Sequence, residues 1–385
     1  MADGTRRKTF HGANGSAEHF ITVTVPPTGN WNEQLEALEA RYAATLSAAG
    51  LPPESAVFRR VFVSDMLNQA PAVEHSSLVR DTPENPVAVS IIQQPPLPGA
   101  KIALFAYHLG SSSPLVKRRL SRRHVLVQSG GQRHLWSTRL CAGAQDDGSS
   151  AHAQTLQVFD DLIEALASQG GTLSEHCLRT WIYLKDVDVF YHGMVQARAD
   201  LFARHGLTDK THYIASTGIE GACAHQYDRV AMDAYSVLDL QPGQVSYLND
   251  FSKMCPTHDY QVTFERGTRV GYADRAHYFI SGTASIDRNG RVVHLLDVIA
   301  QLGRALENLE ALLQDGGASL ADMMYLLVYL RDPADHARVL AYLDERLPDL
   351  PTVILHGPVC RPEWLIEVEG VAVADIPHPA LPPFA

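Results

Sequence analysis

The hydrophobic pattern of the chain repeats three times. Each copy opens on alternating apolar and polar residues that predict a strand, beginning at His19, Leu135 and Tyr278. In the segment that follows, apolar residues recur every three or four positions, which predicts an amphipathic helix. The predicted helix stripes are Leu35, Leu38, Tyr42 and Leu46 in the first copy, Leu156, Phe159, Ile163 and Leu166 in the second, and Leu302, Leu306, Leu309 and Leu313 in the third.

The second half of each copy is also similar to that of the others. An apolar strand pattern ends at an aspartate-containing turn in "FRRVFVSDM", "LRTWIYLKDV" and "MYLLVYLRDP", and a second helical stretch and closing strands follow. The sequence therefore predicts an α+β protein of three tandem ββαβαββ units. The predicted organisation is a flexible tail at 1–18, unit one at 19–109, an exposed polar linker at 110–124, unit two at 125–240 and unit three at 241–385.

The last strand of unit three has an unusual polar face. In "VCRPEWLIEVEG", residues 359–370, the strand alternation places Glu367 and Glu369 on one side, and Cys360 lies just upstream. One interpretation is a solvated strand face. The other is that a carboxyl group and a small polar side chain face a pocket.

Charge and composition exclude several classes of protein. The formal net charge of −11 argues against a nucleic-acid-binding protein. The chain has neither an apolar run of the length that a transmembrane helix needs nor an apolar signal segment at its start, and its five cysteines are scattered, which predicts a reduced, cytoplasmic protein. The 18 histidines show no metal-ligand spacing, so no metal is expected.

The repeated unit resembles the RidA/YjgF superfamily, which has a chorismate mutase-like fold. The resemblance is carried in unit three by "FISGTASI", "ALENLEALL", "VYLRDP" and "WLIEVEGVA". Members of that superfamily are small αβ subunits that form trimers with ligand clefts between subunits. Three units in one chain therefore imply a pseudo-trimer.

Units two and three further resemble the chorismatases, in particular those of the 3-hydroxybenzoate synthase type. The stretches that carry this resemblance are "RTWIYL" at 179–184, "ASTGIEG" at 215–221, "FERGT" at 264–268 and "CRPEWLIEVEG" at 360–370. Each stretch is short, but all four occur in the same order. Unit one departs from those enzymes, whose N-terminal region is a less clear RidA-like unit.

The resemblance implies that Glu367 is a general acid. A carboxyl group in a partly apolar cleft is harder to ionise, so its pKa rises toward the working pH. Cys360 and Gly282 resemble the residues of chorismatases that form 3-hydroxybenzoate. The alternatives are a solvated Glu367, a Cys360 that acts as a small buried hydrophobe, and a Gly282 at a β-bulge.

Two arginines are candidates for binding substrate carboxylates. Arg179 lies in mid-strand between apolar residues, and an inward arginine needs an anion because an unpaired buried charge is costly. Trp181 and Tyr183 share its strand face and are predicted to contact the same ligand. Arg266 is the second candidate, and a structural salt bridge is the alternative for both arginines.

Ser216, Thr217 and Gly218 complete the predicted site. Their hydroxyl and backbone N–H groups suit an anion, although the same residues suit a simple strand-to-turn transition.

The resemblance implies a chorismatase-like enzyme, a hydrolase or lyase of secondary metabolism. It would cleave the enolpyruvyl ether of chorismate to pyruvate and a hydroxybenzoate, with 3-hydroxybenzoate favoured, and would need no cofactor. The expected partner is a small anionic substrate, and the expected assembly is a monomeric pseudo-trimer or a small homo-oligomer.

Two other functions remain open. One is a RidA-like imine or enamine hydrolase or cyclase in a biosynthetic pathway, although Thr352 replaces the arginine that such enzymes carry on the penultimate strand. The other is a non-catalytic pseudo-trimer that binds a small metabolite.

Overall fold

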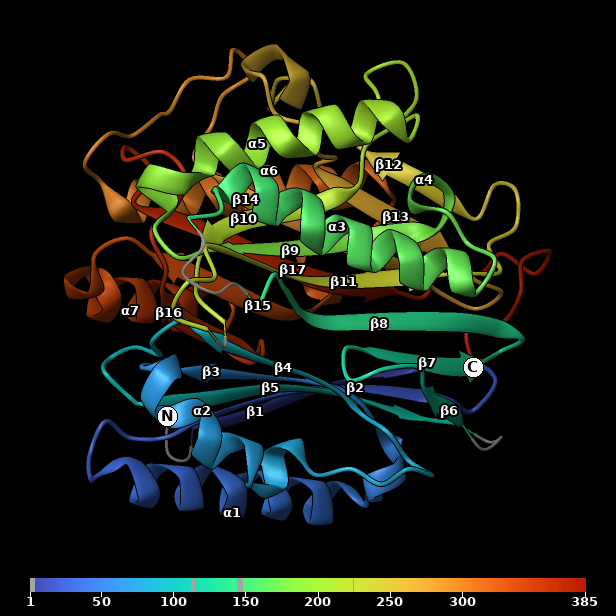
Figure 1. The fold of residues 1–385 in the computed structure, drawn as a ribbon, viewed down its shortest axis with the longest axis vertical. Helices are drawn as coiled ribbons and strands as arrows, with labels where there is room; N and C mark the ends of the chain where they lie inside the picture. Colours follow the sequence, from blue (N-terminus) through green and yellow to red (C-terminus); the bar gives the residue numbers. More distant parts are fainter. Residues whose placement is uncertain (1–3, 112–114, 144–147, 224) are drawn as a thin grey trace.

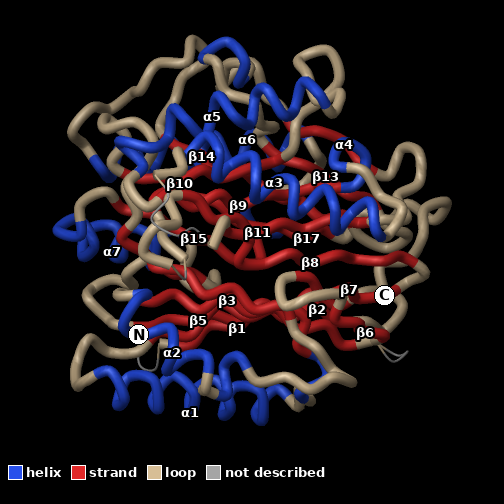
Figure 2. Tube along the Cα trace, in the orientation of Figure 1, coloured by secondary structure: helices blue, strands red, loops and turns tan. Residues whose placement is uncertain are grey.

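Three mixed β-sheets occupy the centre of the molecule, and helices lie at its periphery (Figures 1 and 2). The computed structural model describes residues 4–111, 115–143, 148–223 and 225–385. Each sheet contains the strands expected of one unit, and two sheets add an edge strand from outside the predicted bounds, so the predicted α+β architecture of three tandem units is confirmed.

Unit one is a five-stranded sheet in the order β1-β2-β5-β3-β4, with α1 and α2 on its outer side (Figure 1). Its elements are β1 (Thr5–His11), β2 (Ala17–Thr24), α1 (Trp31–Ala49), β3 (Ala56–Val63), α2 (Met66–Glu74), β4 (Ala88–Gln93) and β5 (Ile102–Gly110).

Unit two is a six-stranded sheet in the order β10-β9-β11-β8-β7-β6. Its elements are β6 (Val116–Arg119), β7 (His124–Ser129), β8 (Gln132–Cys141), α3 (Ala151–Ser168), α4 (Leu173–His176), β9 (Cys177–Leu184), α5 (Val187–Arg204), β10 (Ala215–Glu220) and β11 (Val230–Val237).

Unit three is a six-stranded sheet in the order β12-β13-β14-β17-β15-β16. Its elements are β12 (Val245–Leu248), the 3₁₀ helix η3 (Thr257–Tyr260), β13 (Gly267–Gly271), β14 (Ala276–Ala284), α6 (Val298–Asp315), β15 (Met323–Leu330), α7 (His336–Arg346), β16 (Thr352–His356) and β17 (Ile366–Ala374).

The three sheets share one four-strand order. It is β2-β5-β3-β4 in unit one, β8-β11-β9-β10 in unit two and β14-β17-β15-β16 in unit three. The last pair is parallel in every unit, and the others are antiparallel. This shared order allows each strand position of one unit to be compared with the same position of the others.

The buried helix faces follow the predicted periodicity in units one and three and differ from it in unit two. All four predicted stripe residues of α6 are buried, and the stripe of α1 is buried except at Leu46. In α3 the buried face is rotated, because Val158 and Leu162 are buried where Leu156 and Ile163 were predicted. The rotation fits a helix that packs against α5 as well as against its own sheet.

The predicted flexible tail is wrong for most of its length. Residues 5–11 form β1, which pairs with β2 in antiparallel register, and residues 1–3 lie outside the described part of the chain. The pattern of β1 is polar because its side chains bond to unit three. Arg6 Nη1 donates to the carbonyl of Leu350 at 3.0 Å, and Lys8 Nζ donates to that of Met323 at 2.7 Å.

The predicted linker at 110–124 also contains a strand. Residues 116–119 form β6 at the edge of the second sheet, and residues 112–114 lie outside the described residues. The basic side chains of this segment bond to unit one: Lys117 Nζ donates to Asn85 Oδ1 at 2.8 Å, and Arg119 pairs with Asp81. The polar run therefore joins two units instead of spacing them apart.

A buried arginine–carboxylate pair crosses each of the three interfaces between units. Units one and two are joined by Arg60 and Asp233 at 3.1 Å, and units two and three by Arg179 and Glu369. Units three and one are joined by Arg275 and Glu18 at 2.7 Å. All six side chains are at most 2% exposed, so each pair holds its interface in one register.

Among the described residues, no helix combines the length and the apolar character that crossing a membrane requires.

Removing one partner of an interface pair is expected to destabilise the fold strongly. Asp233→Ala leaves the guanidinium group of Arg60 buried without its carboxylate, so the free energy of unfolding should fall by about 3–5 kcal/mol in urea denaturation. The matched control is Glu307→Ala, which removes a 62% exposed partner of Arg304 and should cost less than about 1 kcal/mol. Equal losses in the two variants would contradict this role of the pair.

Candidate active site

A cavity lies between units two and three. Strand β10 and helix α5 of unit two face strands β14 and β17 of unit three across it, and the space between their atoms, including open solvent at the mouth, is about 460 Å³. It is lined by Tyr191, Arg198, Ser216, Thr217, Gly218, Tyr260, Phe264, Arg266, Gly282, Ala284, Ile286, Cys360, Trp364 and Glu367. The cavity thus brings together all the predicted site residues except Arg179, Trp181 and Tyr183.

Glu367 is the acidic residue of the cavity, and its pKa is strongly raised. Its side chain lies on β17 and is 5% exposed. Burial, assisted by the negative charge of Glu369, raises the pKa of Glu367 from its usual 4.5 to about 8, although Arg179 and Arg266 oppose the shift. A carboxyl group with this pKa is protonated at neutral pH and can act as a proton donor.

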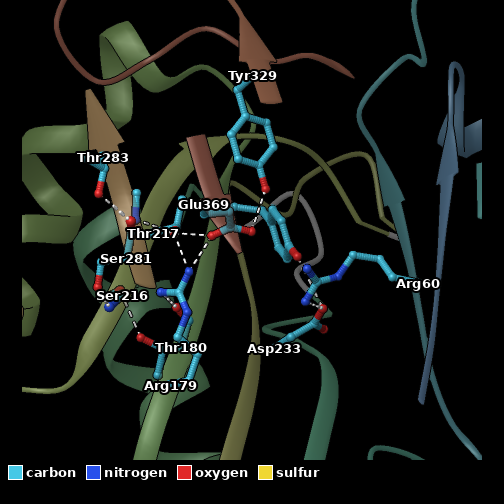
Figure 3. Close-up of polar contacts among 12 residues, drawn as sticks. Arg60, Arg179, Thr180, Ser216, Thr217, Asp233, Ser281, Thr283, Tyr329 and Glu369 are labelled. Carbon is cyan, nitrogen blue, oxygen red and sulfur yellow. Dashed lines mark hydrogen bonds and ion pairs between the residues drawn. The ribbon is translucent and has the colours of Figure 1, made fainter. Parts of the chain in front are cut away.

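Glu369, two residues further along the same strand face, has the opposite environment (Figure 3). Its side chain is fully bonded: Arg179 Nη2 and the Thr217 hydroxyl donate to Oε2, and the Tyr329 hydroxyl donates to Oε1 at 2.9 Å. The two glutamates therefore share a strand face, but only Glu369 has an arginine partner.

The ion pair with Glu369 changes the role predicted for Arg179. The expectation that this buried arginine needs an anion is met by a side chain of unit three instead of by a substrate. Trp181 packs against the guanidinium group, whose carbon lies 4.8 Å from the ring centroid, and the Tyr183 hydroxyl donates to Asp233 at 3.3 Å. None of these three residues lines the cavity, because their strand face points toward the centre of the three sheets.

Gly282 makes room for the Glu367 carboxyl group. A β-carbon at this position would lie 2.8 Å from Glu367 Cδ and 3.1 Å from Thr217 Cγ2, closer than side chains tolerate. The register of β14 against β17 also shifts between Ile280 and Thr283, so Gly282 lies at a bulge as well. The bulge that was the alternative for this glycine is therefore present, and the group that approaches it closely is the side chain of Glu367.

Ser216 and Thr217 line the cavity but also connect the two units. The Ser216 N–H donates to Ser281 Oγ at 2.8 Å, and the Gly282 N–H donates to Thr217 Oγ1 at 2.9 Å. At Gly218 a β-carbon would lie 3.3 Å from Met194 Cε. Two of the groups expected to bind an anion, the Ser216 N–H and the Thr217 hydroxyl, therefore form hydrogen bonds that position β10 against β14.

Two buried guanidinium groups in the cavity have no carboxylate partner among the residues that the structure describes. Arg198 is 2% exposed and donates to Thr263 Oγ1 at 3.2 Å, and Arg266 is 4% exposed and donates to the Cys255 carbonyl at 3.0 Å. Within the described ranges, neither forms an ion pair, and burial lowers the pKa of Arg198. Because a buried unpaired guanidinium is costly, this arrangement suits an anionic ligand.

Arg198 was missed in the sequence analysis. It lies on the buried face of α5 together with Met194, Ala197 and Leu201, at helical spacing. An arginine within an otherwise apolar helical stripe is a signal that could have identified it.

Cys360 lies beside Glu367 as a neutral thiol. Burial and the charge of Glu367 raise the pKa of Cys360 to about 12, although a hydrogen bond from the Tyr191 hydroxyl opposes the shift. A thiol that stays protonated at neutral pH is a poor nucleophile. Cys360 therefore shapes the cavity and contributes a weak hydrogen-bonding group.

Aromatic side chains form the rest of the wall. Tyr260, Phe264 and Trp364 line the cavity, and the guanidinium carbon of Arg361 lies 4.9 Å from the Tyr260 ring centroid and 4.7 Å from that of Trp364. The cavity thus combines flat apolar walls with positive charge, which suits an unsaturated ring that carries carboxylates.

Thr352 lies in a different cleft, between units three and one. The strand that faces Glu367 is β10 of unit two, and Ser216 holds in β10 the register position that Thr352 holds in β16. Strand β10 contains no arginine, so the arginine that the resemblance assigns to ordinary deaminases is not on the strand facing Glu367.

Known proteins are similar to this chain in sequence and in fold. The family profile described as "Endoribonuclease L-PSP" matches residues 270–374. A 3-hydroxybenzoate synthase of Streptomyces hygroscopicus is 33% identical over 263 residues, which span 60% of this chain and 73% of that protein. The 3-aminoacrylate deaminase RutC of Acinetobacter baylyi is 31% identical over 96 residues, which span 24% of this chain and 76% of that protein.

A solved chorismatase structure has the same fold. It covers 83% of this chain and 93% of its own length with a TM-score of 0.64, at 19% identity. The fold and the cleft between units define a RidA/YjgF-type pseudo-trimer, and the chain belongs to the RidA/YjgF superfamily. Within that superfamily it belongs with the chorismatase family, which includes the 3-hydroxybenzoate synthases.

The raised pKa of Glu367 is expected to make stability fall as pH rises. Between the unfolded pKa near 4.5 and the folded pKa of about 8, the folded state binds a proton that the unfolded state has released. The contribution of Glu367 to the free energy of unfolding is therefore fully present below a pH of 4.5. It is lost at up to about 1.4 kcal/mol per pH unit as the pH rises from there to about 8.

Urea denaturation at a series of pH values checks this. Glu367→Gln should remove this part of the pH dependence, whereas Glu363→Gln, at an exposed position just before β17, should keep it. Identical pH profiles for the wild type and Glu367→Gln would show that Glu367 ionises normally.

Proposed function

We propose that the protein cleaves the enolpyruvyl ether of chorismate, releasing pyruvate and a hydroxybenzoate, with Glu367 as the general acid. The observation that carries this proposal is that a protonated buried glutamate shares one cavity with two buried guanidinium groups that lack carboxylate partners. Chorismate has two carboxylates and an acid-labile enol ether, which match these groups. The relationship to a 3-hydroxybenzoate synthase supports the same substrate.

The arginines would orient the substrate. Arg198 and Arg266 each bind one carboxylate of chorismate, in place of the Arg179 and Arg266 pair expected from the sequence. Planar guanidinium groups bind carboxylates through two parallel hydrogen bonds, so two of them hold a rigid substrate in one orientation. The ring then lies against the aromatic wall formed by Tyr260, Phe264 and Trp364.

Glu367 would start the reaction by protonating the methylene carbon of the enol ether. The adjacent carbon becomes oxocarbenium-like and is attacked by an oxygen nucleophile, after which the ether C–O bond breaks and pyruvate leaves. When the ring hydroxyl of the substrate is the nucleophile, its own bond to the ring must break as well, so that its oxygen leaves as the carbonyl oxygen of pyruvate and the ether oxygen stays on the ring as the phenol. The protons lost from the hydroxyl and from the ring carbon on aromatisation balance those gained by the methylene carbon and the phenol, and no water is consumed overall. When water attacks, the products are pyruvate and a dihydro-diol.

The favoured product is 3-hydroxybenzoate. The neutral thiol of Cys360 is a weak hydrogen-bonding group beside the acid, so it holds a water molecule less firmly than a hydroxyl or an amide would. A poorly held water favours attack by the substrate's own hydroxyl. Gly282 belongs to the same group of residues, because its lack of a side chain lets the Glu367 carboxyl group approach β14.

Hydrolysis of an imine or enamine acid is the second candidate function. A stretch of 96 residues is 31% identical to a 3-aminoacrylate deaminase, and such chemistry would use the same Glu367. Arg198 and Arg266 would then bind a single carboxylate.

Glu367→Gln is expected to lower the rate of pyruvate release from chorismate by about 10²–10⁴-fold, because the amide has no proton to donate at neutral pH. A coupled assay for pyruvate, with chromatography of the aromatic products, makes the measurement. Glu363→Gln is the matched control and should keep wild-type activity. Release of ammonia from 2-aminoacrylate-type substrates without pyruvate release from chorismate would move the assignment to the second candidate.

Gly282→Ala is expected to lower kcat by roughly 10–100-fold, because the added methyl group displaces the Glu367 carboxyl group by a fraction of an ångström to an ångström. Steady-state kinetics with chorismate measures the effect. Gly193→Ala on α5, where the nearest atom to a β-carbon is His152 N at 3.4 Å, is the matched control. A wild-type kcat for Gly282→Ala would show that the acid does not need this space.

A further inference from the structure

The interface between units one and two contains a cleft at the position equivalent to the active site. Helix α2 of unit one, through Met66, Ala70 and Glu74, faces Cys141 and His225 of unit two across it. In unit three, Ala284 of β14 pairs with Glu367 of β17, and in unit two Cys141 of β8 pairs with Ala231 of β11. The second cleft therefore has alanine where the first has its acid, and a different set of chemical groups lies nearby.

These groups are two cysteines, a histidine and an aspartate. Cys141 is the last residue of β8, and Cys223, His225 and Asp228 lie in the connection between β10 and β11. The ligand atoms of Cys141, His225 and Asp228 all lie within 4.8 Å of one another. Cys223 Sγ lies 3.8 Å from Asp228 Oδ2, and a side-chain hydrogen bond links Cys223 with Cys141.

We propose that Cys141, Cys223, His225 and Asp228 bind a divalent transition-metal ion of the zinc type. The four residues supply two sulfur, one nitrogen and one oxygen donor, a set that suits four-coordinate Zn²⁺ and does not suit Mg²⁺ or Ca²⁺. Donor atoms in a tetrahedral zinc site are roughly 3.3–3.8 Å apart. The ligand atoms of Cys141, His225 and Asp228 therefore need to close by at most about 1–1.5 Å when the ion binds, and Cys223 Sγ already lies 3.8 Å from Asp228 Oδ2.

The surroundings balance the charge of such a site. Two thiolates and a carboxylate exceed the charge of a divalent ion by one negative unit. Arg123 Nη2 lies 3.6 Å from Cys141 Sγ and provides a compensating positive charge. Cys141, Cys223 and Asp228 are buried, whereas His225 is exposed, which gives an ion a path of entry from solvent.

The position of the site indicates a structural role. With four protein ligands, no coordination position is left open for a substrate. The ion would join the end of β8 to Cys223, His225 and Asp228, and Ala222, which precedes Cys223, accepts a hydrogen bond from Gln93 of β4 in unit one at 2.7 Å. A metal ion here would therefore hold the connection through which unit two contacts unit one.

The sequence analysis expected no metal because the histidines lack ligand spacing. Only one histidine takes part here, and Cys141 comes from a strand far upstream of the other three ligands. Only the folded chain brings the four residues together.

Zinc binding by the full-length chain tests the proposal. After purification with zinc and without chelator, and after dialysis, elemental analysis should find about one zinc per chain. Substitution by Co²⁺ should give the visible absorption and the thiolate-to-cobalt charge-transfer bands of a tetrahedral site. His225→Ala removes an exposed ligand with little effect on folding and should weaken zinc affinity at least about tenfold; Cys141→Ser should also lose part of the charge-transfer intensity.

Two matched variants control for general effects. His11→Ala removes an exposed histidine of β1, and Cys177→Ser changes a buried cysteine of β9, and both should keep wild-type zinc affinity. Failure of the wild type to retain zinc, or equal affinity in wild type and His225→Ala, would overturn the proposal. So would a Cys141–Cys223 disulfide found by mass spectrometry in chain purified under reducing conditions. None of these readouts depends on chorismate turnover.

Discussion

The buried ion pair between Arg179 and Glu369 sets the chemistry of the candidate active site. Glu367 and Glu369 project from the same face of β17, but the arginine of unit two reaches only Glu369. The remaining glutamate is left in an apolar cavity beside a paired carboxylate, and both influences favour its protonated form. An acid suited to neutral pH thus arises from the unequal pairing of two identical side chains, and Thr217 fixes that pairing by bonding to Arg179, Glu369 and Gly282.

The three interfaces use one stabilising device and three different clefts. Each interface has a buried arginine–carboxylate pair, yet the strand position of Glu367 is occupied by Ala231 in unit two and by Ala103 in unit one. A homotrimer would carry three identical clefts, because its interfaces are related by symmetry. Joining the units in one chain removes that constraint, so one cleft can keep an acid while another gathers cysteine, histidine and aspartate.

The fold was predictable because the patterns that specify its strands and helices lie within short stretches of the chain. Strand alternation and helical stripes recur within each unit, and the stripe of α6 is buried at all four predicted positions. Errors occurred where a residue takes its partner from a distant unit. The polar pattern of β1 was read as a tail because its side chains bond to residues of unit three. Arg179 was read as a candidate substrate clamp with a structural salt bridge as the alternative, and the salt bridge, to a glutamate of another unit, is what forms. Arg198 was missed because helical spacing alone does not show which cavity a buried side chain enters.

The sequence by itself determined the repeated unit, the α+β class and the candidate roles of Glu367, Cys360, Gly282 and Arg266. The unit and the class follow from periodicity within an element, which is a local property of the chain, whereas the candidate roles are what the resemblance of short stretches to the chorismatases implies. Only the tertiary structure decided which glutamate is paired and that Arg198 joins Arg266. The physical reason is that the ionisation and ligand preference of a side chain depend on burial and on the charges within a few ångströms, and in this protein those neighbours come from another unit.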